Sequence, residues 1–406
     1  MIWQSSLISE MAKECPDKHR KFSQKMKIVV ACDKYKGSLS ANDVCSIIAG
    51  SIKDIDNTIE VIINPMADGG EGTVETLVES LKGRYEEVRV TGPLGDYVNS
   101  RFGIINNNTA VIEMSAASGL WLVPYDRRNP METTTYGTGE LLKKAAQMGC
   151  SRVIMGLGGS STNDGGMGMA QALGARFYDS RGSLLGLGGS QLSKISRIDI
   201  SSLSSDVLNM IYECACDVEN PLTGKNGAAY VYAAQKGADS AMIKELNRGL
   251  INFSKVVKKD IGKNIRDLKG AGASGGLGGG MVAFLNAKLR VGVNIIIDVT
   301  GLDEKIKNAD LIITGEGAFD RQTFFGKSAY GVANLAKKYN IPVITINGSV
   351  LVDRKSVNRS ESSLFAGNFS ILNKPMDLSD AIENTSVLLE NITKEVVNFF
   401  LKIKRK

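Results

Sequence analysis

Hydrophobic and polar positions follow two different patterns along this chain. Toward both ends, short continuous apolar runs alternate with segments in which apolar residues recur at helical spacing. Such alternation is typical of βαβ units, which build a parallel sheet with helices on both faces. The elements expected from these runs are strands at 27–32, 60–65, 309–315 and 341–348, and helices at 40–54, capped by Ser40, 70–81 and 331–339.

The segment 85–115 has short strands of alternating character, separated by turn residues such as Gly95-Asp96 and Asn106-Asn107. This texture is typical of antiparallel hairpins. We therefore predict an α/β protein in which a doubly wound domain carries an inserted mixed α/β domain. The predicted division is an N-terminal extension at 1–25, one domain formed by 26–84 and 291–406, and an inserted domain at 85–290.

Composition is that of an ordinary soluble globular protein. The chain has 406 residues, 43% of them hydrophobic and 23% charged, with a net charge of +6. This length favours about two domains, and no apolar run reaches the roughly 18 residues of a membrane helix. Basic and acidic residues are interleaved, and the final run LKIKRK reads as a solvated tail. We therefore expect no membrane and no nucleic-acid partner, and a monomer or a homodimer.

Cysteine and histidine content narrows the possible chemistry. None of the six cysteines forms a CxxC pair, and the single histidine is His19, so a zinc site is not expected. Reduced thiols favour a cytoplasmic protein. Residues 1–25 lack the apolar region of a signal peptide, and they are either a disordered extension or lie upstream of a true start at Met26. Without a histidine in the folded part, a general base would be a carboxylate, a lysine or a tyrosine.

Glycine clusters in four turns that are each expected to lead from a strand into a helix. Such turns expose backbone N–H groups at a helix N-terminus, where an anion is favoured. Tight packing of strand against helix explains any single turn equally well, but acidic residues in three of the four favour a polyphosphate with a metal ion. No Walker A motif or dinucleotide fingerprint is complete. The four turns are 64–73, 156–168, which precedes an expected helix at 167–177, 269–281 and 313–328.

Charged side chains accompany these turns. Because the turns lie at the carboxyl edge of a parallel sheet, where α/β ligands bind, we expect their side chains to meet there. Helix capping is the alternative for each carboxylate, and turn initiation is the alternative for Asp217. A solvated surface position is the alternative for Lys236. The candidates are Asp68, Glu71, Asp164, Asp217, Glu316 and Asp320 among the acids, and Lys36, Lys236 and Lys327 among the bases.

Taken together and in order, these segments resemble one family, the type-1 glycerate kinases. The resemblance covers about residues 26–400 and rests on long motifs. These include KGSLSA, DGGEGT, TGPLG, AVIEMSAASGL, TTYGTGEL, GLGGSSTNDGG, CDVENPLTG, AAQKGA, GAGASGGLGGG, TGEG, DRQT and GVANLAKK.

The resemblance implies a fold and a reaction. The fold is a Rossmann-like, flavodoxin-like domain with an inserted domain described as restriction-enzyme-like. The reaction is the phosphorylation of D-glycerate by ATP with Mg²⁺, giving 2- or 3-phosphoglycerate. Phosphoryl transfer needs positioning and charge neutralisation more than covalent chemistry.

On this basis we predict roles for individual residues. The turns at 158–162 and 275–279 are expected to hold nucleotide phosphates, and Arg128 is expected to bind the carboxylate of glycerate. The predicted catalytic residues are Lys36, Asp164, Glu316, Asp320 and Lys327; the substrate-binding residues are Asp68, Gly69, Gly70, Glu71 and Arg128; the nucleotide-binding residues are Gly158, Gly159, Ser160, Ser161, Thr162, Lys236, Gly275 and Gly276; the metal ligands are Asp164, Asp217 and Glu316.

Three positions depart from the family pattern. Lys34 replaces a serine, Ala318 follows TGEG where a basic residue is usual, and Phe325 replaces a histidine. These changes leave two alternatives open, a non-catalytic regulator that binds nucleotide or metabolite on the same scaffold, and a kinase for a related hydroxyacid. The sequence does not decide which carboxylate is the base.

Overall fold

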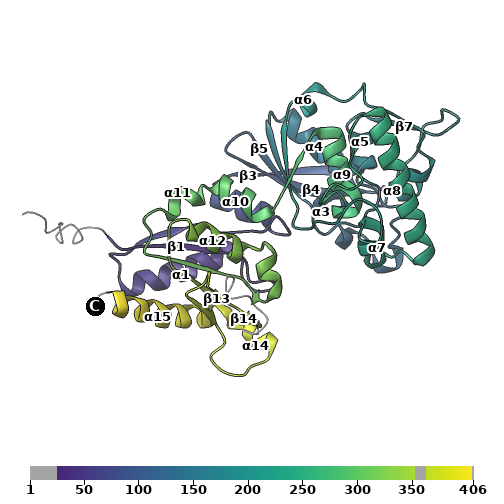
Figure 1. Cartoon of the computed structure of the whole chain (residues 1–406). Coiled ribbons are helices and arrows are strands. Elements are labelled where there is room, and N and C mark those ends of the chain that lie inside the picture. The colour runs from purple at the N-terminus through teal and green to yellow at the C-terminus, as the bar shows by residue number, and fades with distance from the viewer. Residues whose placement is uncertain (1–24, 353–362, 405–406) are drawn as a thin grey trace, which may run out of the picture.

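The computed structural model describes residues 25–352 and 363–404. The predicted extension at 1–25, with His19, therefore lies almost wholly outside the described residues. Figure 1 shows two lobes, one containing both the early and the late parts of the chain and the other containing the middle part. Each lobe is built around one large sheet.

The first lobe contains a five-stranded sheet in the order β15-β13-β11-β1-β2. Every neighbouring pair in it is parallel, which confirms the predicted parallel sheet. Numbered along the chain, this order is the 2-1-3-4-5 of doubly wound flavodoxin-like sheets. The strands are β1 (Lys27–Cys32), β2 (Glu60–Ile63), β11 (Leu311–Gly315), β13 (Val343–Asn347) and β15 (Gly367–Ser370).

Helices cover both faces of this sheet because its strands are apolar on both sides. In β1, Ile28 and Val30 pack with helices α1 and α15, whereas Val29 and Ala31 pack with α10 and α12. Ser40 caps α1 as predicted, since its Oγ accepts a hydrogen bond from the N–H of Asp43. The helices of this lobe are α1 (Ala41–Ile55), α2 (Thr73–Ser80), α10 (Gly292–Thr300), α11 (Leu302–Ile306), α12 (Ser328–Lys337), α14 (Leu378–Glu383) and α15 (Thr385–Lys404).

The second lobe contains a six-stranded mixed sheet in the order β10-β9-β6-β5-β4-β3. Strands β3, β4 and β5 are antiparallel neighbours, as the turn residues predicted, and β5, β6, β9 and β10 are parallel. The strands are β3 (Arg84–Thr91), β4 (Tyr97–Ile105), β5 (Thr109–Glu113), β6 (Arg152–Gly156), β9 (Ile211–Ala215) and β10 (Lys288–Arg290).

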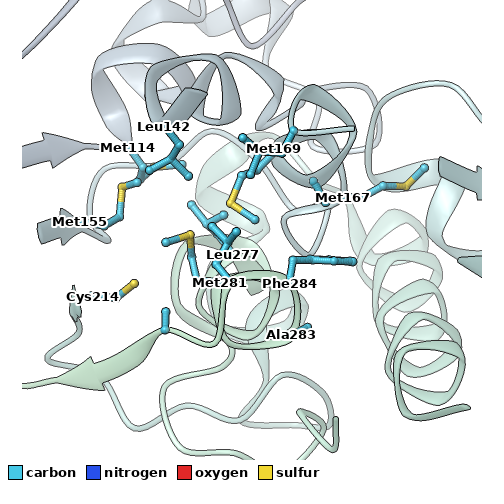
Figure 2. Close-up of a cluster of buried hydrophobic side chains, with 14 of the residues drawn as sticks. Met114, Leu142, Met155, Met167, Met169, Cys214, Leu277, Met281, Ala283 and Phe284 are labelled. Carbon is cyan, nitrogen blue, oxygen red and sulfur yellow. The ribbon is translucent and has the colours of Figure 1, made fainter. Parts of the chain in front are cut away.

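One face of the mixed sheet packs on a methionine-rich core. Met155 of β6 and Cys214 of β9 face Met169 and Met281, which come from helices α5 and α9 (Figure 2). Unbranched methionine side chains fill irregular gaps between elements of different direction. The helices of this lobe are α3 (Ser115–Ser118), α4 (Tyr136–Gln147), α5 (Met167–Ala172), α6 (Ser205–Leu208), α7 (Ala228–Tyr232), α8 (Ser240–Asp260) and α9 (Leu277–Leu285). Four short strands complete the fold, β7 (Arg176–Tyr178), β8 (Arg197–Asp199), β12 (Ala318–Phe319) and β14 (Ser349–Val350).

The opposite face of the mixed sheet joins the two lobes. Val111 and Ile154 belong to the same buried cluster as Val29 and Ile312 of the parallel sheet. Helices α2 and α10 lie between the sheets and supply Leu77 and other apolar side chains to that cluster. The carboxyl ends of strands from both sheets are therefore held close to one apolar junction.

An ion-pair triad crosses the mixed sheet near this junction. Glu213 of β9 accepts hydrogen bonds from Arg152 of β6 at 2.8 Å and from Arg290 of β10 at 2.5 Å. Arg290 also pairs with Asp298 of α10 at 2.5 Å. Burial acts to raise the pKa of Glu213, but the hydrogen bonds from the two arginines outweigh it and lower the pKa. Together with Asp298 as a fourth member, these residues connect three parallel strands to a helix of the other lobe.

Two expectations about local structure were wrong. The helix expected at 167–177 ends at Ala172, because Gly174 at φ +112° reverses the chain and strand β7 begins at Arg176. The glycine stretch 269–281 follows a loop after α8 rather than a strand. The boundaries predicted at 84/85 and 290/291 stay predictions. Within residues 25–352 and 363–404, no helix combines the length and apolar character needed to cross a bilayer.

Candidate active site

A pocket of about 1030 Å³ opens where glycine turns from both lobes meet. The turn before α2 contributes Gly69, Gly70 and Glu71, and the turn after β6 contributes Gly158 and Gly159. The structure thus places predicted substrate-binding and predicted nucleotide-binding residues on the wall of one cavity. Strands β3 and β4 form another part of that wall.

The glycines allow the two lobes to approach backbone to backbone. A Cβ atom on Gly69, which has φ +87°, would lie 2.2 Å from the Cβ of Ala215 at the end of β9. A Cβ on Gly156 would lie 2.6 Å from the carbonyl oxygen of Gly69. Side chains at these positions would separate the lobes and widen the floor of the pocket.

Three aspartates follow different strands near these turns, although none of them lines the pocket itself. Asp33 follows β1, Asp68 follows β2, and Asp217 follows β9 of the other sheet. Asp33 accepts hydrogen bonds from Ser328 Oγ at 2.5 Å and from the N–H of Lys34 at 2.7 Å. Asp217 accepts a hydrogen bond from the N–H of Gly292 at 2.8 Å.

The pKa values of these carboxyl groups indicate how closely their charges are packed. Burial, together with the negative charge of Asp68, raises the pKa of Asp33 to about 7. The same two causes raise the pKa of Asp217 to about 6. A carboxyl group whose pKa lies near neutrality can exchange protons at physiological pH, as a general base must.

Glu316, Asp320 and Lys327 form a second charged group beside the first. Lys327 Nζ lies 3.1 Å from Glu316 Oε2 and 3.8 Å from Asp320 Oδ1, and Thr323 Oγ1 donates to Glu316 Oε1 at 2.6 Å. Burial raises the pKa of Glu316 despite these partners. Burial opposes the charge of Lys327, yet the carboxylates of Glu316, Asp320 and Asp68 raise the pKa of its ammonium group. This lysine is therefore a cation held among acids.

Glu316 and Asp320 do not share a helix face as their spacing had suggested. Glu316 directly follows β11, and Asp320 caps a short 3₁₀ helix at Arg321–Phe325, where it accepts from the N–H of Gln322. Lys327 brings the two carboxylates together across this turn. Asp320 therefore has a capping role whatever else it does.

Two lysines lie beside Glu71, and one of them is in the pocket wall. Lys34 lines the pocket, and its Nζ donates a hydrogen bond to the carbonyl oxygen of Glu71. Lys36 is largely exposed and lies 4.0 Å from the carboxylate of Glu71. Lys34, which departs from the family pattern, thus supplies a cation at the pocket wall. Of the other two positions that depart from the pattern, Ala318 lies in β12 and Phe325 is exposed before Gly326.

The remaining predicted residues form a separate buried cluster behind the Gly158–Gly159 turn. Lys236 is 1% exposed, and its Nζ donates hydrogen bonds of 2.7 Å to Ser160 Oγ and to the carbonyl oxygen of Thr162. Ser161 Oγ donates to the carbonyl oxygen of Ser118 at 3.0 Å. These polar groups are directed at the protein itself.

Asp164 is fully buried in the same cluster. Its carboxylate accepts hydrogen bonds from both the N–H and the Oγ1 of Thr135 at 2.8 Å, and from the N–H groups of Gly166 and Gly168. Burial raises its pKa, although these hydrogen bonds lower it in part. Asp164 therefore connects the N-terminus of α4 to that of α5. Its oxygens are occupied by hydrogen bonds from the protein, and its predicted catalytic and metal-binding roles stay predictions.

Gly275, Gly276 and Arg128 also pack against protein rather than facing the pocket. A Cβ on Gly275 would lie 2.0 Å from the carbonyl oxygen of Thr162, and one on Gly276 would lie 2.9 Å from the Cα of Gly165. The guanidinium of Arg128 lies over the ring of Tyr125 at 5.2 Å. None of the three lines the pocket, and their predicted binding roles stay untested.

Sequence reasoning missed two carboxylates at this site. Asp33 and Glu113 stand at the carboxyl ends of β1 and β5, and Glu113 lines the pocket and accepts from the N–H of Val74 at 3.1 Å. Both follow directly from the rule that ligands bind at the carboxyl edge of parallel strands. Neither lies in a glycine-rich turn, and such turns were the sequence signal for most of the predicted site residues.

The acidic side chains of the site determine whether it could hold a divalent cation. In the part of the chain that the structure describes, no three acidic, thiol or imidazole side chains are grouped so as to hold a metal ion by themselves. Mg²⁺ in phosphoryl-transfer enzymes is usually bound by one or two carboxylates together with substrate phosphates. Asp68 and Glu316 are the carboxylates that fit this more modest requirement, since both act on one ammonium group, that of Lys327, although neither lines the pocket.

Comparison with known proteins identifies the relatives of this chain. The model of the glycerate kinase family matches residues 28–401. The chain is 45% identical to a glycerate kinase of Bacillus subtilis, covering 91% of this chain and 97% of that protein. It is 47% identical to a glycerate 2-kinase of Escherichia coli, covering 81% and 86%. A crystal structure from Salmonella typhimurium LT2, provisionally assigned as glycerate kinase 2, has a TM-score of 0.87 at 43% identity and covers 94% of this chain and all of that one.

Proposed function

The chain belongs to the glycerate kinase family, and on that premise we propose that it transfers the γ-phosphoryl group of ATP to a hydroxyl group of D-glycerate. The observation that carries the proposal is a pocket lined by glycine turns from both lobes, with the carboxyl groups of Glu71 and Glu113 in its wall and Asp68 next to its lining residue Gly69. Backbone amides of glycine turns suit phosphate groups. The size of the pocket, about 1030 Å³, leaves room for a nucleotide beside a three-carbon acid.

Asp33 is the residue that we assign as proton acceptor. As the hydroxyl oxygen of glycerate forms its bond to phosphorus, the bond between the γ-phosphorus and the β,γ-bridging oxygen breaks, and ADP leaves. The hydroxyl proton passes to a carboxylate oxygen of Asp33. Ser328 Oγ donates to Oδ2 and the backbone N–H of Lys34 donates to Oδ1, which fixes that carboxyl group, and its pKa near 7 makes it a base of suitable strength.

Positive charge is needed where the phosphoryl group transfers. Lys327 lies among Glu316, Asp320 and Asp68, and Lys34 lines the pocket. We assign Lys327 to neutralising the transferred phosphoryl group and Lys34 to the carboxylate of glycerate. Asp68 and Glu316 would hold Mg²⁺, which when bound supplies further neutralisation of the nucleotide phosphates.

The finer features of the proposal concern product and architecture. The Escherichia coli relative is named a glycerate 2-kinase at 47% identity, which favours 2-phosphoglycerate as the product. Residues 26–84 with 291–406 would form the flavodoxin-like domain, and 85–290 the inserted, restriction-enzyme-like domain. These assignments are consistent with the two sheets and extend beyond them.

An assay of ADP release tests the activity. The purified chain is mixed with ATP, Mg²⁺ and either D-glycerate, L-glycerate or another small hydroxyacid, and phosphorus NMR then identifies the product. We expect ADP release that depends on D-glycerate and a phosphorus signal coupled to the proton on carbon 2. ATP binding without turnover on any of these acids would instead favour the non-catalytic regulator. Turnover on another hydroxyacid alone would favour a kinase for that acid.

A further inference from the structure

Lys236 is a buried cation for which the proposed reaction has no direct use. It ends a 3₁₀ turn, Ala234–Lys236, directly after α7, and only 1% of it is exposed. Its two hydrogen-bond acceptors, Ser160 Oγ and the carbonyl oxygen of Thr162, are both uncharged. Fully buried lysines are rare unless a partner compensates for the loss of water.

The two bonds hold the segment that follows the pocket wall. Ser160 and Thr162 lie on either side of Ser161, directly after Gly158 and Gly159, which line the pocket. Gly159 has φ +67°, and its carbonyl oxygen accepts from the N–H of Leu120 at 2.8 Å. The direction in which this turn presents its backbone amides therefore depends on where Lys236 holds Ser160.

The charge of Lys236 is poorly balanced within the protein. Among the described residues its hydrogen-bond partners include no acid, and the acid that acts on its pKa is Asp164, whose carboxylate already accepts hydrogen bonds from Thr135, Gly166 and Gly168. Burial lowers the pKa of Lys236 to about 7, against the attraction of Asp164.

We propose that Lys236 is a positioning residue for the nucleotide, which fixes the Ser160–Thr162 segment so that the Gly158–Gly159 backbone meets the phosphate groups, and which takes up a proton when those phosphates bind. This inference rests on the proposed use of ATP. The ammonium group reaches the nucleotide through Ser160 rather than by contact.

Linkage gives the proposal a measurable sign. Phosphate groups at the turn stabilise the charged form of Lys236, so the pKa of its amine is higher in the complex than in the free protein. Between these two pKa values, the affinity for ATP falls up to about tenfold for each unit by which pH rises. A variant without a titrating group at position 236 should lack this part of the pH dependence of ATP affinity.

The experiment is calorimetric titration with ATP and Mg²⁺ between pH 7 and 9, in two buffers of different ionisation enthalpy. The variants are Lys236→Met, Lys236→Arg and Ser160→Ala, and the exposed Lys225→Met is the matched control. The wild type and the control should take up protons on binding, most strongly near pH 8. Lys236→Met should bind ATP about 10-fold or more weakly at pH 7 and should take up fewer protons. The protons that ATP itself exchanges are common to all the proteins, so the difference between them reports on Lys236.

The other two variants separate charge from position. Arginine stays charged throughout this range, so Lys236→Arg should bind without the additional proton uptake. Ser160→Ala keeps the lysine but frees one of its contacts, so it should bind several-fold more weakly while proton uptake remains. It also keeps the test decisive if thermal unfolding shows that Lys236→Met does not fold.

Equal affinity and equal proton uptake in wild type and Lys236→Met would overturn the inference, as would unchanged binding by Ser160→Ala. Neither result affects the proposed function if the wild type still releases ADP with D-glycerate. Absence of that turnover in a wild type whose ATP binding is coupled to Lys236 would reject the kinase and leave the nucleotide site.

Discussion

Replacing Asp33 by asparagine should abolish turnover and at the same time stabilise the fold. Asparagine keeps the size of the side chain and an oxygen that can accept from Ser328 Oγ, which bonds Asp33 at 2.5 Å, but it does not accept a proton. Loss of a general base typically lowers the rate about 10²- to 10⁴-fold. We expect a fall of that size in kcat/KM for D-glycerate.

The effect on stability follows from the pKa of Asp33. In the folded protein it is about 7, against an ordinary value of 3.8, so the folded state binds this proton more tightly than the unfolded state. The carboxyl group therefore makes the fold less stable as pH rises from about 4 to about 7. At 1.36 kcal/mol for each pH unit, the full effect is about 4 kcal/mol at pH 8 and falls to about 2 kcal/mol at pH 5.

Two measurements test this pair of effects. Initial rates between pH 5 and 9 should show wild-type kcat/KM rising to a plateau with a midpoint near 7, and almost no activity in Asp33→Asn. Urea unfolding at pH 5 and 8 should show the variant to be the more stable protein, with the larger difference at pH 8. A variant that keeps most of its activity, or that is less stable than wild type at pH 8, would refute the assignment of Asp33.

Three further substitutions probe the surroundings of the site. Gly69→Ala places a Cβ 2.2 Å from that of Ala215, so we expect a loss of about 2 kcal/mol or more in unfolding free energy and lower activity, both partly restored by adding Ala215→Gly. Asp164→Asn puts an NH2 group, which cannot accept, in place of one oxygen of a buried carboxylate that accepts four hydrogen bonds; it should cost roughly 1–3 kcal/mol in thermal unfolding, and a near-normal rate in the folded fraction would remove Asp164 from the chemistry. Glu213→Gln should destabilise the protein at neutral pH. Because the pKa of Glu213 is lowered, the difference from wild type should shrink as pH falls toward 3 in urea unfolding, and a constant difference would contradict the role given to its arginine pairs.

The parallel sheet could be predicted because its signals are local. The run at 27–32 is apolar on both faces, as expected of a strand whose sheet is covered by helices on both sides. It is β1 in the structure. Likewise Asn106 and Asn107 adopt positive φ between β4 and β5, as their residue types suggested. Elements set by neighbouring residues along the chain are the ones that the sequence predicted best.

The candidate site could be predicted only in part, because one glycine pattern serves two purposes. Gly158 lines the pocket, whereas Gly275 is glycine because a Cβ would lie 2.0 Å from the carbonyl oxygen of Thr162. The composition of the two turns is alike. It therefore does not show whether a glycine is needed because a ligand approaches the backbone or because another part of the protein does. The burial of Asp164 and Lys236 likewise depends on packing between distant segments.

Asp33 is the opposite case, because a general rule predicts its position although its local sequence differs from that of the glycine turns. It stands one residue beyond β1, at the edge where ligands bind, but its turn contains two lysines, a tyrosine and only one glycine, Gly37. Its raised pKa arises from burial and from Asp68, which lies 35 positions further along the chain. Only the fold brings these carboxyl groups together.

The location of the reaction is tested most directly by a crystal structure of the chain with ADP, Mg²⁺ and D-glycerate. We predict density for both ligands in the pocket between the lobes, with phosphate groups at the amides of Gly158 and Gly159 and a glycerate hydroxyl within hydrogen-bond distance of Asp33. Ligands bound elsewhere, or a glycerate hydroxyl remote from Asp33, would contradict the account.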